Sequence, residues 1–159
     1  MVTVAEIKGY KLFYGLDESE LNEIAKLCIK HTYEANEVIT VMNSPAKDLY
    51  ILVDGNNALQ IEVPISSHRP KVAIQTLGKG EAFGWAAIVP PHLRTASARM
   101  IDRAEVICID GQKLRVLLEN DNHIGYILMR NVSMLISSRL SYTTVALRDQ
   151  LERLAPSFR

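Results

Sequence analysis

Residues 77–99 read LGKGEAFGWAAIVPPHLRTASAR and carry the strongest local signal in the chain. Three glycines, Gly78, Gly80 and Gly84, fall within seven residues, and glycine permits tight turns and a close approach of the backbone to a ligand. A short apolar run follows Gly84, and free N–H groups at the start of a helical turn favour an anion. Arg94 comes ten residues after Gly84, and its planar guanidinium group suits two phosphate oxygens. The pattern predicts an anion cradle of backbone amides closed by an arginine.

Short apolar and β-branched runs flank this segment. They read YEANEVITV, DLYILVDG, ALQIEV, VAIQTL and AEVICID, with turn-forming residues between them. Residues 54–57, DGNN, form a strong hairpin signal because glycine and asparagine tolerate positive φ. Pro64 and the polar stretch 66–70 mark another connection. Several short strands at close spacing predict a jelly-roll-like β-roll over residues 33–110.

Segments with helical periodicity lie before and after the strands. Residues 17–30, DESELNEIAKLCIK, predict a helix with possible caps and one apolar face, formed by Leu21, Ile24, Ala25 and Cys28. After Asp110, residues 111–120 predict a short helix and residues 122 to about 154 a long one without interior proline. The long segment has an apolar stripe at Leu128, Val132, Leu135 and Tyr142, and further apolar surface at Leu140, Leu147, Leu151 and Leu154.

A helix of about 30 residues would be about 45 Å long, which is more than a small β-roll covers. We therefore expect part of its apolar surface to meet a partner, with a homodimer through the C-terminal helix as the favoured arrangement. The alternative is that the helix breaks and folds back on its own domain.

Composition limits the function. The chain has 159 residues, 48% of them hydrophobic, and its 18 Lys and Arg cancel its 18 Asp and Glu, which gives no electrostatic basis for broad binding to nucleic acid or to an anionic membrane. No apolar run is long enough to span a membrane and no leader pattern is present, so we expect a cytoplasmic protein. Cys28 and Cys108 each lie in an apolar pattern and are interpreted as buried small hydrophobic residues, the alternative being a disulfide or a reactive thiol.

The four histidines, His31, His68, His92 and His123, lack metal-ligand spacing. No catalytic constellation stands out either, so we expect neither an enzyme nor a metal site.

The glycine-rich stretch resembles the phosphate-binding cassette of the cyclic-nucleotide-binding domain family, found in the catabolite activator protein and in kinase regulatory subunits. The matching positions are Gly80, Glu81, Phe83, Gly84, Ala87, Arg94, Thr95, Ala96 and Ser97. LFYGLDESEL and PAKDLYILVDG also resemble family segments, so the resemblance covers residues 12 to about 145. It implies an α+β fold for a single domain over 1–159, with an N-terminal helical segment (1–32), a β-roll (33–110) holding a cassette at 78–97, and C-terminal helices (111–155).

The resemblance further implies a regulatory ligand-sensing module that binds a cyclic nucleotide, cAMP or cGMP, or another small anion at Arg94 and the backbone of residues 84–87. The C-terminal helix would carry the signal. The implied ligand-binding residues are Phe83, Gly84, Trp85, Ala86, Ala87, Arg94, Thr95, Arg139, Thr143 and Thr144. Thr95 is the residue type that cGMP-preferring members place after the arginine, and Thr143 and Thr144 would reach the base. The alternative for these two threonines is the helix surface.

Trp85 departs from the family pattern. It replaces the carboxylate that accepts a hydrogen bond from the ribose 2′-hydroxyl in the family, and an indole can only donate. Either Trp85 fills the ribose pocket and abolishes nucleotide binding, or it belongs to a site altered for another anion; the third interpretation is plain core packing. We expect Arg139 near Trp85, where a cation–π contact would replace the family's Arg–Glu pairing.

An alternative function is a degenerate, ligand-free domain that acts as a dimerisation or protein-interaction module. In activator-type relatives a helix-turn-helix domain follows the long helix. No recognition helix or basic patch precedes Arg159 here, so we expect no DNA-binding element in this chain.

Overall fold

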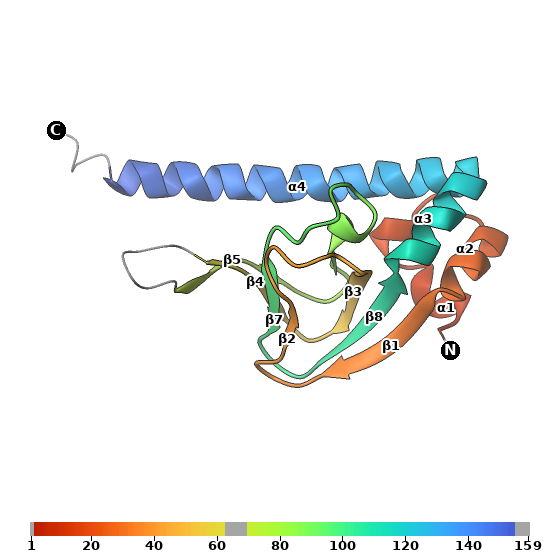
Figure 1. The fold of residues 1–159 in the computed structure, drawn as a ribbon, viewed down its shortest axis with the longest axis horizontal. Coiled ribbons are helices and arrows are strands. Elements are labelled where there is room, and N and C mark those ends of the chain that lie inside the picture. The colour runs from red at the N-terminus through yellow and green to blue at the C-terminus, as the bar shows by residue number, and fades with distance from the viewer. Residues whose placement is uncertain (1, 63–69, 155–159) are drawn as a thin grey trace.

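The computed structural model of the chain describes residues 2–62 and 70–154, in which short helices precede two sheets and a long helix ends the fold (Figure 1). The helical elements before the sheets are α1 (Val4–Ile7), the 3₁₀ helix η1 (Lys11–Phe13) and α2 (Glu18–Ala25). After the sheets come α3 (Gly111–Asn120) and α4 (Asn122–Leu154). The predicted α+β class, with a β-roll between N-terminal helices and a long last helix, is confirmed.

Two four-stranded antiparallel sheets form the β-roll. The first has the order β1 (Cys28–Tyr33), β8 (Ala104–Asp110), β3 (Asp48–Asp54) and β6 (Ala82–Phe83). The second has the order β2 (Val38–Thr40), β7 (Ser97–Met100), β4 (Asn57–Glu62) and β5 (Lys71–Leu77). A 3₁₀ helix, η2 (Trp85–Ala87), follows β6.

The central strands of the first sheet are buried on both faces. Along β3, Leu49 and Ile51 pack with the helices in one core cluster, whereas Tyr50 and Leu52 pack with the second sheet in another. Successive side chains of a strand point to opposite faces, so a strand covered on both sides needs a continuous apolar run. Burial on both faces of β3 therefore explains why the apolar run in DLYILVDG is uninterrupted.

The two cysteines lie on different faces of the same sheet. In the register of β1 and β8, Cys28 pairs with Ile109 and Ile29 pairs with Cys108, so the two side chains point to opposite sides. Both are buried and free, and burial raises the pKa of the Cys28 thiol to about 12. The thiols therefore act as small core side chains.

The predicted helix over residues 17–30 is wrong at its C-terminal end. Helix α2 starts with a capping box, in which the Asp17 carboxylate accepts from the Glu20 N–H at 2.9 Å and Glu20 accepts from the Asp17 N–H at 2.8 Å. It ends at Ala25, and the chain enters β1 at Cys28 rather than near residue 33. Pairing along the whole of β8 outweighs the helical periodicity of these residues.

The predicted hairpin at residues 54–57 is also wrong. The turn joins β3 to β4, and these strands belong to different sheets. Gly55 has a φ of 88°, and a Cβ there would lie 2.6 Å from the Cβ of Ala104 at the start of β8. The glycine is needed because the chain crosses between the sheets against this strand. The other predicted connection consists of Pro64 and the polar stretch 66–70, and all of it except Pro70 lies outside the described residues.

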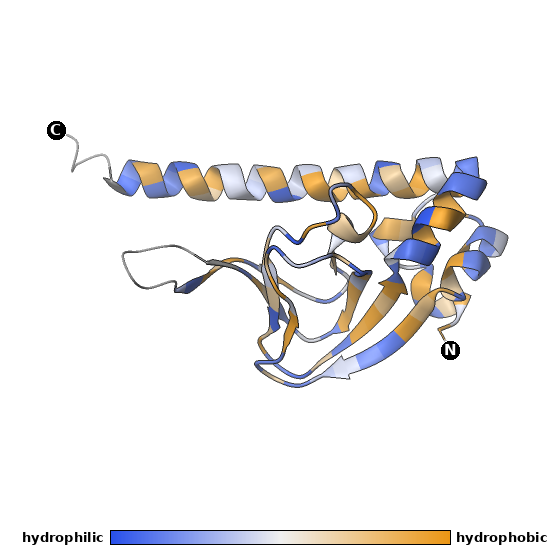
Figure 2. Ribbon diagram, viewed as in Figure 1, coloured by the Kyte–Doolittle hydropathy of each residue, from blue (hydrophilic) through white to orange (hydrophobic). Residues whose placement is uncertain are grey.

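Helix α4 has two different halves. Its 33 residues correspond to about 50 Å. Leu128 and Val132 are fully buried against the domain, Leu135 is half-buried, and Tyr142 is exposed. From Leu140 to Arg153 every residue is exposed, yet apolar positions recur along this part of the helix (Figure 2). Among the described residues, no helix is long and apolar enough to span a membrane.

Candidate anion-binding site

The candidate site lies where the chain leaves β6. Gly84 follows Phe83 with a φ of 83°, and η2 begins at Trp85. A Cβ on Gly84 would lie 2.6 Å from Nη1 of Arg94 and 3.0 Å from the carbonyl oxygen of Asp48. Both the backbone conformation and the available space therefore require glycine here. The fold brings the glycine and the arginine of the predicted cradle into contact.

Arg94 extends its side chain into the interior beside β3. It is only 6% exposed. Its Nη2 donates to the carbonyl oxygen of Asp48 at 3.1 Å, and the guanidinium carbon lies 5.3 Å from the centroid of the Tyr50 ring, within cation–π range. Its other terminal nitrogen, Nη1, is buried and has no hydrogen-bond partner among the described residues.

The charge of Arg94 is poorly compensated. None of the ion pairs between described residues includes Arg94. Burial raises the pKa of Asp48, and the nearby charge of Arg94 opposes that rise without cancelling it. Burial also raises the pKa of Tyr50 to about 12, so this phenol carries no charge at neutral pH. A buried guanidinium group without a paired anion costs free energy, and an anion from outside would reduce that cost.

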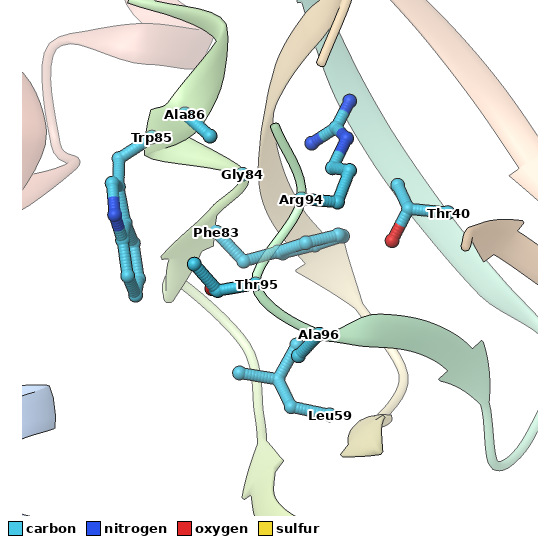
Figure 3. Close-up of a pocket in the computed structure, with 9 residues that line it drawn as sticks. All are labelled: Thr40, Leu59, Phe83, Gly84, Trp85, Ala86, Arg94, Thr95 and Ala96. Atoms are coloured by element: carbon cyan, nitrogen blue, oxygen red, sulfur yellow. The ribbon is translucent and has the colours of Figure 1, made fainter. Parts of the chain in front are cut away.

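A small cavity of about 30 Å³ lies beside this arginine (Figure 3). Its walls come from β2, β4, β6, η2 and the segment leading into β7, and the lining residues are Thr40, Leu59, Phe83, Gly84, Trp85, Ala86, Arg94, Thr95 and Ala96. Phe83 and Arg94 are buried, whereas Thr95 is exposed and Trp85 is half-buried. The cavity therefore runs from a buried end at the arginine to a mouth at Thr95 and Trp85.

Trp85 does not cover Arg94. In Figure 3 its indole ring points away from the guanidinium group. The ring packs against the core cluster that also contains Leu128 and Val132 of α4. Trp85 thus combines core packing with a place at the edge of the cavity.

Arg139 approaches a different part of the cassette from the one expected. It is buried on α4, where its Nη2 donates to the carbonyl oxygen of Ala82 at 3.0 Å and lies 3.7 Å from Oε1 of Glu81. Burial lowers the pKa of Arg139. The cation–π contacts among described residues join Arg94 to Tyr50 and Arg130 to Tyr126, so the expected contact between Arg139 and Trp85 is absent from this set. Instead of the Trp85 ring, Arg139 contacts the carboxylate of Glu81 and the backbone carbonyl of Ala82.

Only some of the candidate residues line the cavity. Those that do are Phe83, Gly84, Trp85, Ala86, Arg94 and Thr95. Ala87 does not, and its carbonyl accepts a hydrogen bond from Nη1 of Arg115. Thr143 and Thr144 are exposed, and their hydroxyls donate to the carbonyls of Arg139 and Leu140 at 3.0 and 2.8 Å. The structure does not bring these two threonines to the cavity.

Four residues at the site went unnoticed in the sequence. Thr40 and Leu59 line the cavity, while Asp48 and Tyr50 hold the guanidinium group. They come from β2, β4 and β3, and their local sequence carries only a strand signal. Pairing of the sheets, which the sequence does not specify, places them beside Arg94.

Metal chemistry finds no support in the described part of the chain, where no three or more His, Cys, Asp or Glu side chains cluster to hold an ion. His92 lies within the cassette, and its Nδ1 is 2.9 Å from the carbonyl oxygen of Ala86.

Comparison with known proteins points to one family. The sequence model of the family described as cyclic nucleotide-binding domain matches residues 30–121, which is more than half of the chain. Among curated proteins, a candidate potassium channel protein of Rhodopseudomonas palustris is 23% identical over 128 residues, or 80% of this chain. The chain spans only 29% of the length of that relative.

Solved structures show the same fold. A candidate cyclic nucleotide-binding protein of Geobacter metallireducens matches with a TM-score of 0.75 and 28% identity, covering 88% of this chain and 99% of its own. The catabolite activator protein of Thermus thermophilus matches with a TM-score of 0.68 and 22% identity, over 89% of this chain and 63% of its own. The regulatory domain of Toxoplasma gondii PKA, crystallised with cAMP, matches with a TM-score of 0.68 and 17% identity, over 87% of this chain and 48% of its own.

Proposed function

Because the chain belongs to the cyclic nucleotide-binding domain family, we propose that it is a ligand-sensing regulatory module that binds a cyclic nucleotide or another small anion at Arg94 and the backbone of residues 84–87. The C-terminal helix carries the signal. One observation carries this proposal: the guanidinium group of Arg94 is buried, and its Nη1 has no hydrogen-bond partner among the described residues.

The energetics favour a functional role for this arginine. A buried donor without a partner costs about 1–3 kcal/mol, and more when it is charged. The hydrogen bond to Asp48 and the contact with Tyr50 offset part of that cost, the latter by about 0.5–2 kcal/mol. A bound anion would place a negative charge and an acceptor next to Nη1. Ligand binding therefore supplies what the fold alone leaves unsatisfied.

The cassette and α4 are in direct contact, which provides a route for the signal. Arg139 of α4 donates to the carbonyl of Ala82, two residues before Gly84. Ala86 and Ala87 share a core cluster with Leu128 and Val132 of α4. A ligand shifts a conformational equilibrium only if it binds the two states with different affinity. An anion that moves residues 84–87 would change these contacts and thereby the position of the helix.

The output is a second copy of the chain that docks on the exposed half of α4. Leu140, Leu147 and Leu151 are 66%, 58% and 54% exposed, and their spacing places them on one side of the helix. Leu128 and Val132, which are buried against the domain, lie on a different side of the helix, about 100° away around its axis. Helix α4 can therefore stay packed against its own domain while its exposed half pairs with a second copy.

A ligand-free dimerisation module is the second candidate, and the small volume of the cavity favours it. About 30 Å³ holds roughly two water molecules, so a nucleotide would have to leave its sugar and base outside the cavity. In this alternative Arg94 is a structural residue that holds β3 through Asp48 and Tyr50.

Thermal-shift titrations distinguish the two candidates. We would titrate the wild type, Arg94→Met and the matched surface control Arg99→Met with cAMP, cGMP and a panel of small anions. A ligand at 100 times its Kd adds about 2.7 kcal/mol, which raises Tm by roughly 5–10 °C for a chain of this size. We expect at least one anion to stabilise the wild type and Arg99→Met but not Arg94→Met. If no anion does so, the ligand-free module is correct.

A further inference from the structure

We propose that the cavity beside Arg94 binds the carboxylate of a small organic acid with an apolar body rather than a cyclic nucleotide. This inference rests on the proposed function, because it requires an anion at Arg94, and it narrows the class of that anion.

The size of the cavity fits an anionic head group. About 30 Å³ beside a buried arginine corresponds to roughly two water molecules, and a carboxylate presents two oxygens in a plane. A carboxylate also matches the planar guanidinium group. The mouth at Thr95 and Trp85 would leave a short body between the cavity and solvent.

The walls offer little to a sugar or a base. Of the nine lining residues, Leu59, Phe83, Ala86 and Ala96 present only apolar side chains. None of the nine carries a carboxylate or a carboxamide, so the hydroxyls of Thr40 and Thr95 are the only side-chain acceptors. A ribose hydroxyl and the edge of a purine would lose hydrogen bonds to water here without full replacement, which costs free energy. A ligand with an apolar body avoids that loss.

The charge of the site selects a monoanion. Arg94 is the only charged residue in the lining, and one of its terminal nitrogens already donates to the Asp48 carbonyl. The Asp48 carboxyl lies near enough for the two charges to interact. A carboxylate balances the single charge of Arg94, whereas a dianionic phosphate brings a second negative charge that no lining residue balances. A cyclic phosphate is also a monoanion, so the walls of the cavity, and not its charge, separate a cyclic nucleotide from a carboxylate with an apolar body.

Trp85 provides a direct readout because it is the only tryptophan of the chain and lies at the edge of the cavity. We would follow its fluorescence during titration with benzoate, with benzamide as the uncharged isostere, and with inorganic phosphate, cAMP and cGMP. Free tryptophan in the same solutions corrects for quenching in bulk, and calorimetry confirms binding. The proteins are the wild type, Arg94→Met, Ala96→Phe, which fills the apolar wall, and the surface control Arg99→Met.

The expected result is saturable binding of benzoate, at least tenfold tighter than any binding of benzamide, phosphate or either cyclic nucleotide. Arg94→Met and Ala96→Phe should each weaken it at least tenfold, and Arg99→Met should not. Tighter binding of cAMP or cGMP that depends on Arg94 would overturn this inference and leave the proposed function standing. Equal binding of benzoate and benzamide would overturn it as well. If none of the anions binds the folded wild type, both the inference and the proposed function fail.

Discussion

The guanidinium group of Arg139 on α4 lies 3.7 Å from the carboxylate of Glu81 and donates to the carbonyl of Ala82 at 3.0 Å. These two residues immediately precede Phe83 and Gly84, so the contact joins the long helix to the start of the anion-binding segment. Among the described residues, no other side-chain hydrogen bond or ion pair joins α4 to the cassette, and this contact lies on the half of the helix that covers the domain.

Replacement of Arg139 by alanine should destabilise the protein. The substitution leaves the buried carbonyl of Ala82 without its donor, which costs about 1–3 kcal/mol. Arg148 on the same helix is the matched control, because it is exposed and, within the described part of the chain, pairs only with exposed Asp149 and Glu152. Arg148→Ala should change stability by less than about 0.5 kcal/mol. Urea denaturation measures both, and equal effects would show that the link at Ala82 contributes nothing.

Gly84→Ala should cost more stability than Gly80→Ala. Both glycines have a φ of 83°, so both substitutions carry the same backbone strain of about 1–2 kcal/mol. A Cβ at Gly80 meets nothing within 4 Å, whereas one at Gly84 would press on Arg94 and on the backbone of Asp48. Overpacking of this kind adds about 1–3 kcal/mol. Unfolding curves for both variants check the difference; identical losses would mean that Gly84 is required only for its φ.

The contact between His123 and Glu20 should make stability depend on pH. Nδ1 of His123, at the start of α4, lies within hydrogen-bond distance of the Glu20 carboxylate on α2, and this contact raises the pKa of His123. A raised pKa stabilises the folded state fully below the unfolded value of about 6.5, and the contribution disappears as the pH rises through the folded value.

The test compares His123→Gln with the wild type at pH 5.5–6 and at pH 8–9. The stability lost in the variant should be larger at the lower pH. His31→Gln is the control, since His31 is exposed and forms no ion pair within the described residues. A loss that does not change with pH, or that changes equally in the control, would contradict the assignment.

Glutamates at Leu140 and Leu147 should abolish dimerisation without unfolding the domain. Both side chains are exposed in the monomer, so their replacement removes no internal contact, but two charges in a helix pair would be buried without partners. Sedimentation equilibrium should show dimers for the wild type and monomers for the double variant. Val116→Glu, at an exposed apolar position on α3, should remain dimeric. A double variant that stays dimeric would place the interface elsewhere.

The sequence could predict the cassette because its glycines and Arg94 are close together in the chain, and their roles depend on local conformation. It could not predict Thr40, Leu59, Asp48 or Tyr50 at the site, since the pairing of distant strands brings them there.

Local patterns misled where tertiary contacts compete with them. Helical periodicity continues through Cys28, but pairing with β8 makes this segment a strand. The DGNN turn has the composition of a hairpin, but it carries the chain from one sheet to the other. The expected contact between Arg139 and Trp85 depended on the orientation of Trp85, which packs into the core, and Arg139 donates to the carbonyl of Ala82 instead.

The free energy of unfolding of Arg94→Met, measured in a buffer without phosphate, nucleotides or organic acids, tests most directly whether Arg94 serves a ligand. Methionine keeps an apolar stem and removes a buried charge without a paired anion, which by itself costs free energy. It also removes the hydrogen bond to the Asp48 carbonyl and the contact with Tyr50, and in the absence of ligand these gains and losses should nearly cancel. The variant should therefore be within about 1 kcal/mol of the wild type, or more stable, in the absence of ligand. A loss of more than about 2 kcal/mol would show that Arg94 supports the fold through Asp48 and Tyr50, and would contradict the assignment of this arginine as an anion receptor.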